Sequence, residues 1–174
     1  IKAYDEAVRL DPSSPVLWSN KGYSLDKLGK YDEAIKAYDG AIKLNSSEPI
    51  YWNSKGNALY TQDRYKEAIE AYDEAIRLNP SSSVLWCNKG YALDKLGKYD
   101  EAIEAYDEAI RLNLSEPLYW SNKGYALDSL LRYDEAVEAY DKAIKLNSSE
   151  PSYWDHKGDA FYEQAKYEAA VEAY

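Results

Sequence analysis

Residues able to support covalent or metal chemistry are scarce in this sequence. It contains one histidine, His156, and one cysteine, Cys87, which are far apart in the chain. A cysteine nucleophile needs a base such as histidine within hydrogen-bond reach, so no such pair is expected. Asp155, His156 and Asp159 would share one helical turn and could hold a metal, but a solvated acidic surface explains them better. With no glycine-rich phosphate loop or serine nucleophile motif, we predict that the protein is not an enzyme and needs no metal or cofactor.

Composition narrows the classes of partner. The 174 residues are 45% hydrophobic and 30% charged, which is typical of a chain that folds. The formal net charge of −10 disfavours nucleic acid, whose phosphates attract basic surfaces. No apolar run is long enough to cross a membrane. The chain opens IKAYDEAVRL, without an initiator methionine or a signal-peptide pattern, so we interpret it as a piece of a longer protein and expect a cytoplasmic location.

The sequence repeats with a period of 34 residues. Tryptophans recur at this interval, at Trp18, Trp52, Trp86, Trp120 and Trp154. A second series of tyrosines keeps the same interval from Tyr4 to Tyr174. A fixed period of this size is typical of stacked supersecondary units. We therefore divide the single array, residues 1–174, into a partial repeat 1–14, full repeats 15–48, 49–82, 83–116 and 117–150, and a truncated repeat 151–174.

Each repeat contains two amphipathic segments. In the first full repeat, apolar residues with helical spacing predict one helix from about Pro15 to Gly29 and another from about Tyr31 to Leu44. Gly29 and Lys30 are expected to form the short turn between them. The fold is therefore predicted to be all-α.

The pattern resembles the tetratricopeptide repeat (TPR) family over the whole chain. The residues of the first full repeat that match its signature are Trp18, Gly22, Leu25, Ala34, Tyr38 and Ala41. The family's last-position proline is kept only as Pro12 and Pro80, and another proline follows three residues later in most repeats. The resemblance implies antiparallel helix pairs in a right-handed superhelix, with the first helix of each pair lining a concave groove.

A lysine occupies the signature's leucine position in every repeat, at Lys21, Lys55, Lys89, Lys123 and Lys157. We expect each lysine to bury its aliphatic stem and extend its ammonium to a carbonyl, a carboxylate or a tyrosine hydroxyl at the edge of the core.

The resemblance places one polar and aromatic face in the groove. Most of the 19 tyrosines fall at framework positions or beside the tryptophans, where packing explains them. Five others recur on the opposite face of the first helix, together with asparagines, as in peptide-binding surfaces. The candidate peptide-binding residues are Asn20, Tyr23, Asn53, Asn57, Tyr60, Asn88, Tyr91, Asn122, Tyr125 and Tyr162.

Two binding modes of the family can be compared with these residues. The carboxylate clamp of co-chaperone TPR domains needs cations where this chain has Asn53, Leu118 and Asn122, so we reject it although Asn57 and Asn88 match its asparagines.

The second mode is the asparagine ladder of the O-linked N-acetylglucosamine transferase superhelix. Asn20, Asn88 and Asn122 match it, whereas Ser54 and His156 interrupt it. An amide offers a donor and an acceptor, so it can bind an extended backbone whatever its side chains.

These observations favour a protein-interaction scaffold that binds an extended peptide segment in its groove. The face carries six acidic residues and two lysines, so the expected ligand is neutral to mildly basic. The alternatives are an adaptor region of a larger enzyme, with the chemistry elsewhere, and a self-assembling structural array.

Both ends of the sequence interrupt a repeat. The chain starts IKAY and stops VEAY, which are the same four positions of the repeat, and neither end carries a polar capping unit. We expect the uncovered faces to associate end to end, and further repeats on both sides in the intact protein.

Overall fold

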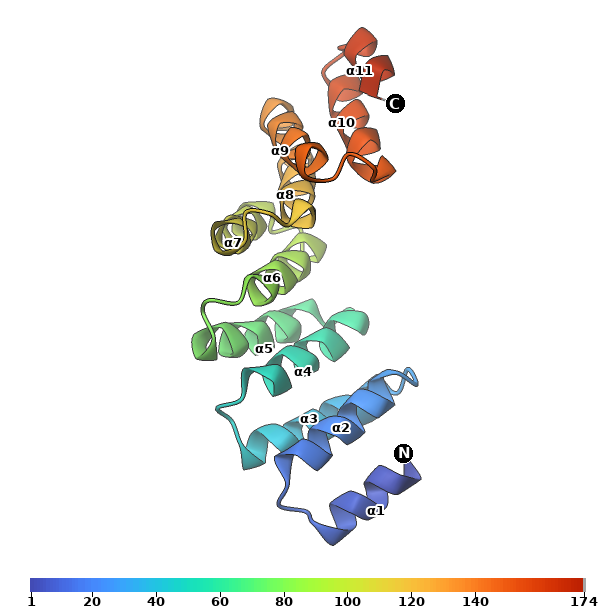
Figure 1. The fold of residues 1–174 in the computed structure, drawn as a ribbon, viewed down its shortest axis with the longest axis vertical. Coiled ribbons are helices and arrows are strands. Elements are labelled where there is room, and N and C mark those ends of the chain that lie inside the picture. The colour runs from blue at the N-terminus through green and yellow to red at the C-terminus, as the bar shows by residue number, and fades with distance from the viewer. Residues whose placement is uncertain (174) are drawn as a thin grey trace. The chain divides into compact units, whose positions relative to one another are not determined.

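The computed structural model describes residues 1–173, which form helices joined by short turns and contain no strand (Figure 1). The helical structure of these residues confirms the all-α prediction. Tyr174, the last tyrosine of the periodic series, lies outside the described residues. The helices are α1 (Lys2–Leu10), α2 (Pro15–Asp26), α3 (Tyr31–Leu44), α4 (Pro49–Thr61), α5 (Tyr65–Leu78), α6 (Ser83–Lys95), α7 (Tyr99–Leu112), α8 (Pro117–Ser129), α9 (Tyr133–Leu146), α10 (Pro151–Glu163) and α11 (Tyr167–Ala173).

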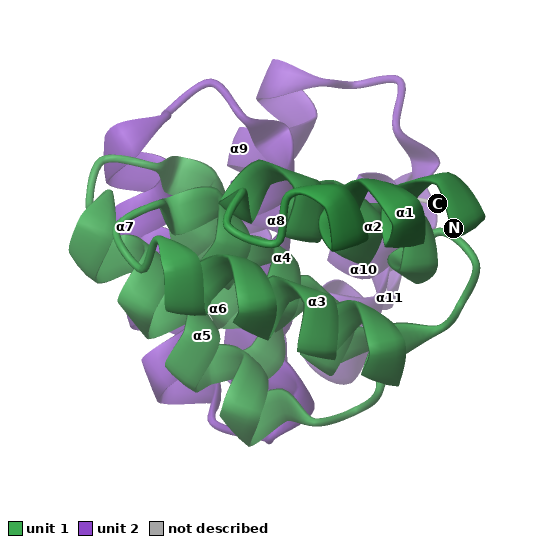
Figure 2. Cartoon of the chain, turned by 90° about the horizontal axis from the view of Figure 1, so that it is seen from below, with its two compact units in different colours: residues 1–92 green, residues 93–174 purple. Residues whose placement is uncertain are grey.

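The chain forms two compact units, and the boundary between them falls within the sequence of α6 (Figure 2). Unit 1 comprises Ile1–Ala92 and unit 2 comprises Leu93–Tyr174. In unit 1, α2 packs against α3 and α4 packs against α5; in unit 2, α8 packs against α9 and α10 against α11. Because each pair is joined by a short turn, its two helices run antiparallel, as the resemblance to the TPR family implies.

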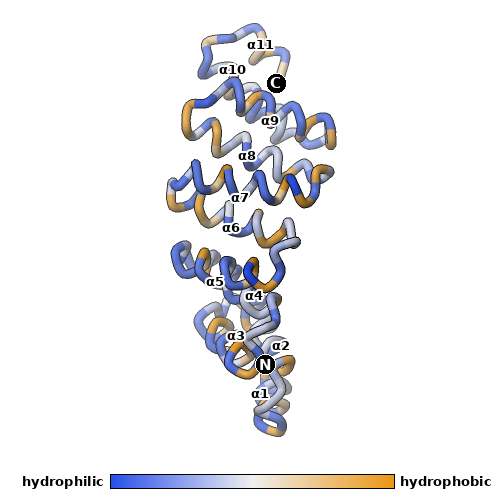
Figure 3. The backbone as a smooth tube through the Cα atoms, turned by 90° about the vertical axis from the view of Figure 1, so that its left-hand side faces the viewer, coloured by the Kyte–Doolittle hydropathy of each residue, from blue (hydrophilic) through white to orange (hydrophobic). Residues whose placement is uncertain are grey.

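Local sequence explains where the helices begin and end. Pro15 and Pro49 stand in the first turn of α2 and α4, where a missing N–H costs nothing. The helices α3, α5, α7 and α9 carry at least one acidic residue in the first turn and a basic residue in the last, as α7 does with Asp100 and Arg111, which complements the helix dipole. Apolar and polar residues alternate along these helices (Figure 3), so each buries one face.

The turn between the two helices of a repeat needs a left-handed residue. Gly29 and Gly97 adopt a φ of 71° there. The same position carries side chains in the other repeats, where Asp63, Leu131 and Ala165 have φ between 57° and 60°. A side chain disfavours this conformation, so these three turns are less favourable than the glycine turns.

Small residues allow the paired helices to approach closely. Ala34 and Ala41 are fully buried, and Tyr38 is 1% exposed. A Cβ atom added at Gly22 would lie 2.7 Å from Cε1 of Tyr38, which is closer than side-chain atoms normally come. The glycine of the first helix therefore leaves room for the ring of the second.

The structure confirms the expectation about the repeated lysines. Each ammonium contacts an aspartate on the second helix of the preceding repeat at 2.6 to 2.7 Å, as Lys89 contacts Asp73 and Lys123 contacts Asp107. The Lys89 ammonium also lies 5.7 Å from the ring centre of Trp86. The lysine side chain is 24% exposed, so its stem covers the core edge while its charge stays at the surface.

Candidate functional site

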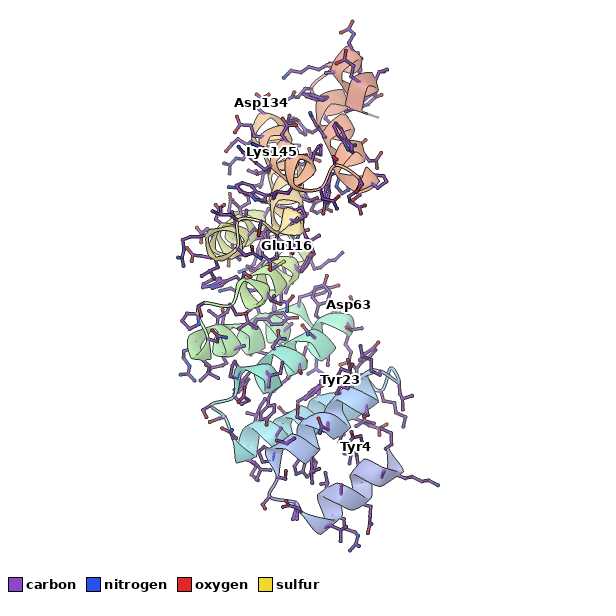
Figure 4. The ribbon with its side chains drawn as sticks, in the orientation of Figure 1. Tyr4, Tyr23, Asp63, Glu116, Asp134 and Lys145 are labelled. Carbon is purple, nitrogen blue, oxygen red and sulfur yellow. The ribbon has the colours of Figure 1, made fainter. Side chains whose placement is uncertain are left out.

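The first two candidate residues lie on the surface of α2. Asn20 is exposed, and Tyr23 is 58% exposed at the C-terminal end of the helix (Figure 4). The Lys27 ammonium lies 5.2 Å from the centre of the Tyr23 ring, which is a cation–π distance. Neither candidate lines the pocket described next.

Three asparagines of unit 1 form one hydrogen-bonded group. The Asn88 amide on α6 donates to Asn53 Oδ1 at 3.0 Å and to Asn57 Oδ1 at 3.5 Å, both on α4. Asn57 Oδ1 also accepts from the Tyr72 hydroxyl of α5 at 2.8 Å. Burial raises the pKa of Tyr72, so its hydroxyl keeps the proton that it donates. This amide network holds the side chains of two successive first helices in fixed orientations.

The amide network opens into a pocket of about 240 Å³ lined by Asn57, Tyr60, Thr61, Tyr72, Asn88 and Tyr91. Four of these residues are sequence candidates, and Asn53 joins them through Asn88. Tyr60 is held edge-on against Tyr65 with ring centres 5.4 Å apart. The pocket is thus lined by aromatic rings and amides, which suits a side chain of a peptide and its neighbouring backbone.

The candidates of unit 2 are more dispersed. Tyr125 on α8 is 50% exposed, and Asn122 on the same helix is half-buried. Tyr162 at the end of α10 is 58% exposed and packs edge-on against Tyr167, with ring centres 5.4 Å apart. These three residues stand apart from the pocket of unit 1, which is lined by other residues.

The five candidate tyrosines form two rows rather than one. Tyr23, Tyr91 and Tyr125 follow the repeat glycine directly, whereas Tyr60 and Tyr162 stand three residues later in the repeat. The five tyrosines of this face therefore do not all recur in one register. The two positions lie nearly one helical turn apart on the same face, so each repeat offers its ring at one of two heights.

Sequence reasoning missed a partly buried carboxylate at the end of α6. Asp94 accepts a hydrogen bond from the Tyr106 hydroxyl at 2.5 Å. Burial raises the pKa of Asp94 to about 6, because the hydrogen bond from Tyr106 and the charge of Lys95 offset the lost hydration only in part. Asp26 and Asp128 occupy the same repeat position, so the sequence places an acid there but gives no measure of its burial.

Sequence reasoning also missed an acidic group between α8 and α10. Burial raises the pKa of Asp128, and the charges of Asp159 and Glu163 raise it further, while His156 opposes them. His156 packs against the ring of Tyr140, with ring centres 5.6 Å apart. Within residues 1–173, no group of three or more histidine, cysteine or acidic residues is arranged to hold a metal ion.

Comparison with protein families identifies the chain. The family model described as "Tetratricopeptide repeat" matches residues 19–83, 87–151 and 129–174. The chain belongs to the tetratricopeptide repeat family. The family is generally non-catalytic, and a search of curated proteins found no match. Across the described part of this TPR chain, no helix is long and apolar enough to cross a membrane.

Solved structures share the TPR fold. A crystal structure of MamA protein superimposes with a TM-score of 0.86 at 23% identity, over 91% of this chain and 87% of that one. MamA 41-end from Desulfovibrio magneticus RS-1 gives a TM-score of 0.87 at 21% identity, over 91% of this chain and 90% of that one. YrrB, described as a TPR protein with an unusual peptide-binding site, gives 0.81 at 22% identity, over 98% and 88%. At these identities the likeness concerns the fold alone.

Proposed function

We propose that this TPR array is a protein-interaction module that binds an extended peptide segment, with its principal anchor in unit 1. The observation that carries the proposal is the amide network of Asn53, Asn57 and Asn88 opening into a pocket walled by Tyr60 and Tyr91. YrrB supports it as a similar array whose structure is described by its peptide-binding site.

The hydrogen bonds of Asn88 leave one of its polar atoms, Oδ1, for a ligand. Its Nδ2 donates to Asn53 and Asn57, so the amide plane is fixed before any ligand arrives. Its Oδ1 takes no part in those bonds and can accept from a peptide N–H. A preoriented acceptor loses less conformational entropy on binding than a mobile side chain would.

Charge favours a neutral to mildly basic peptide. The chain carries 31 acidic and 21 basic residues, so long-range electrostatics repel acidic segments. A carboxylate entering the amide pocket would find no cation among Asn57, Tyr60, Thr61, Tyr72, Asn88 and Tyr91, which line it. A buried carboxylate without such a partner is strongly unfavourable.

Selection from random peptides tests the proposal and does not require the ligand to be identified first. A displayed library of about twelve residues, which spans about 40 Å when extended, would be selected against the whole chain. Synthetic peptides from the selection would then be titrated by calorimetry against the wild type, Asn88→Ala and Asn20→Ala. Because Asn88→Ala removes the fixed acceptor and loosens Asn53 and Asn57, we expect about tenfold weaker binding.

Asn20→Ala is the matched control, because it removes an exposed amide outside the pocket. It should change affinity by less than about twofold. Equal affinities for all three proteins, with unchanged helicity by circular dichroism, would refute the anchor. Selection of peptides with acidic C-termini would refute the charge argument.

A further inference from the structure

The amide network of unit 1 presents one donor and one acceptor that the rest of the described chain does not use. Within residues 1–173, the Asn57 side chain accepts from Tyr72 and Asn88 through Oδ1, and its Nδ2 donates to no other group. The Asn88 side chain donates through Nδ2, and its Oδ1 accepts from no group in the same range. Asn57 is exposed and Asn88 is half-buried, so a ligand in the pocket can reach both.

The unused nitrogen and the unused oxygen are close enough for one ligand group to contact both. Asn88 Nδ2 and Asn57 Oδ1 lie 3.5 Å apart. The nitrogen and oxygen of one amide are about 2.3 Å apart, so Asn57 Nδ2 and Asn88 Oδ1 are separated by at most about 8 Å. A ligand amide that forms a hydrogen bond of about 2.9 Å at each end covers this span.

A primary carboxamide matches this pair of atoms better than a backbone peptide group does. In a trans peptide group the N–H and the C=O point in opposite directions, so it fits only one arrangement of donor and acceptor. The carboxamide of glutamine or asparagine has two N–H bonds, one of them on the side of its oxygen. It can therefore meet Asn57 and Asn88 whether their free atoms lie on one side of it or on opposite sides.

The pocket has the size and the walls for such a side chain. Its volume of about 240 Å³ corresponds to about eight waters at ~30 Å³ each, which leaves room for a glutamine side chain. Tyr60, Tyr72 and Tyr91 are part of its lining. A flat amide on a short methylene stem can pack against aromatic rings of this kind.

The other classes of side chain leave at least one of the two amides unsatisfied. A carboxylate has no N–H for Asn88, and no cation lines the pocket to pair with it. An ammonium or a guanidinium has no acceptor for Asn57. An apolar side chain would displace water from both amides without replacing its hydrogen bonds.

We propose that the pocket of unit 1 is a subsite for a glutamine or asparagine side chain of the bound peptide. Asn57 Nδ2 donates to the carboxamide oxygen, Asn88 Oδ1 accepts from the carboxamide nitrogen, and the rings of Tyr60 and Tyr91 flank the stem. The subsite rests on the proposed function, to which it adds the type of residue that the anchor recognises.

Peptides of nearly equal shape test the subsite on the unaltered chain. Acetylated and amidated glycine–serine peptides would carry glutamine, glutamate or methionine between two lysines, which suit the acidic chain, and would be titrated into the ¹⁵N-labelled protein. The glutamine peptide should shift the side-chain NH₂ signals of Asn57 and bind at least about tenfold more tightly than the other two. Equal affinities of the glutamine and methionine peptides would overturn the proposal.

A matched pair of variants locates the recognition. Asn57→Leu keeps the shape of the side chain but removes its donor, so the preference for glutamine over methionine should fall to about twofold or less. Asn20→Leu makes the same change at an exposed position outside the pocket and should retain the preference. Because two peptides are compared on each variant, a change in stability affects both titrations alike. A preference that persists in Asn57→Leu would show that this amide does not read the carboxamide.

The failure of the subsite and the failure of the proposed function give different results. If library peptides bind and respond to Asn88→Ala, but methionine in place of their glutamines and asparagines changes affinity by less than about twofold, only the subsite is wrong. N-acetylglutamine methylamide and N-acetylmethionine methylamide give the opposite case. If the first binds as tightly as the glutamine peptide and about tenfold more tightly than the second, the pocket reads a carboxamide but the extended peptide adds nothing, and the proposed function is wrong.

Discussion

A single methyl group added at Gly56 should disrupt both the core and the amide network of unit 1. In Gly56→Ala the new Cβ atom would lie 2.6 Å from Cε1 of Tyr72, whereas ordinary contacts begin at 3.4 Å. The ring must therefore retreat by about 0.8 Å. Its hydroxyl then leaves Asn57, which it now contacts at 2.8 Å.

The expected loss of stability follows from three terms. Overpacking of a filled core costs about 1–3 kcal/mol. Loss of the hydrogen bond from the buried Tyr72 hydroxyl costs about 1 kcal/mol. The better helix propensity of alanine returns about 1 kcal/mol. The net loss of about 2 kcal/mol should lower Tm by about 4–8 °C in a chain of this size, as measured by circular dichroism, and should weaken binding of selected peptides.

Gly40→Ala is an informative control because its geometry is similar and its expected outcome is opposite. The added Cβ would lie 2.8 Å from the Trp18 ring. The same position in the next three repeats carries Glu74, Glu108 and Lys142, so the tryptophan site accepts a side chain there. We expect a Tm unchanged or raised by up to about 4 °C, through helix propensity. Equal losses of Tm in Gly56→Ala and Gly40→Ala would refute the reasoning.

Three further variants test other features. Leu131→Gly relieves a φ of 60° at an exposed turn and should add about 1 kcal/mol to the free energy of unfolding; a lower Tm would contradict the turn geometry. The pKa of Asp94 is about 6 in the folded chain and near 3.8 in the unfolded chain. The free energy of unfolding should therefore fall as the pH rises from 3.8 to about 6. In urea titrations, Asp94→Asn should reduce this dependence on pH. After allowing for partial exposure, it should raise the free energy of unfolding by about 1 kcal/mol at neutral pH. A pH profile equal to that of the wild type would show that Asp94 does not cause the dependence. Lys89→Met keeps the apolar stem but loses contact with Asp73, so Tm should fall by about 2–4 °C at low salt and by less at high salt; a Tm equal to the wild type at low salt would show that the ion pair adds nothing.

The period, the helical spacing within each repeat and the resemblance to the TPR family together predicted the fold. A tryptophan, a glycine and a tyrosine recurring every 34 residues imply one packing unit used repeatedly, and the family comparison confirms it. The hypothesis about the repeated lysines is also confirmed. It could be made from the sequence because a charged residue at a core position has few ways to lie in a helix pair. Its actual partner, the aspartate of the preceding repeat, was only one of several that periodicity allowed.

The candidate site was predicted less completely. Helical periodicity says which side of a helix a residue occupies, but it does not say which side chains on neighbouring helices meet. Asn53, Asn57 and Asn88 therefore appeared as separate candidates, although they form one network. The roles of Asp94 and Asp128 depend on burial, which the sequence does not reveal for an acid in an amphipathic helix.

The periodic tyrosine of the second helix shows how a uniform array can acquire different sites. The ring is the same in each repeat, since Tyr38, Tyr72, Tyr106 and Tyr140 are all almost fully buried. The group near its hydroxyl changes: Ser54 beside Tyr38, Asn57 beside Tyr72, and Asp94 beside Tyr106. These partners stand on first helices, at positions where the core does not fix the residue type. Substitutions there can change the polarity of the exposed face while the ring keeps its packing. An amide site in unit 1 and an acidic group in unit 2 can therefore arise on one repeated framework without loss of the shared core.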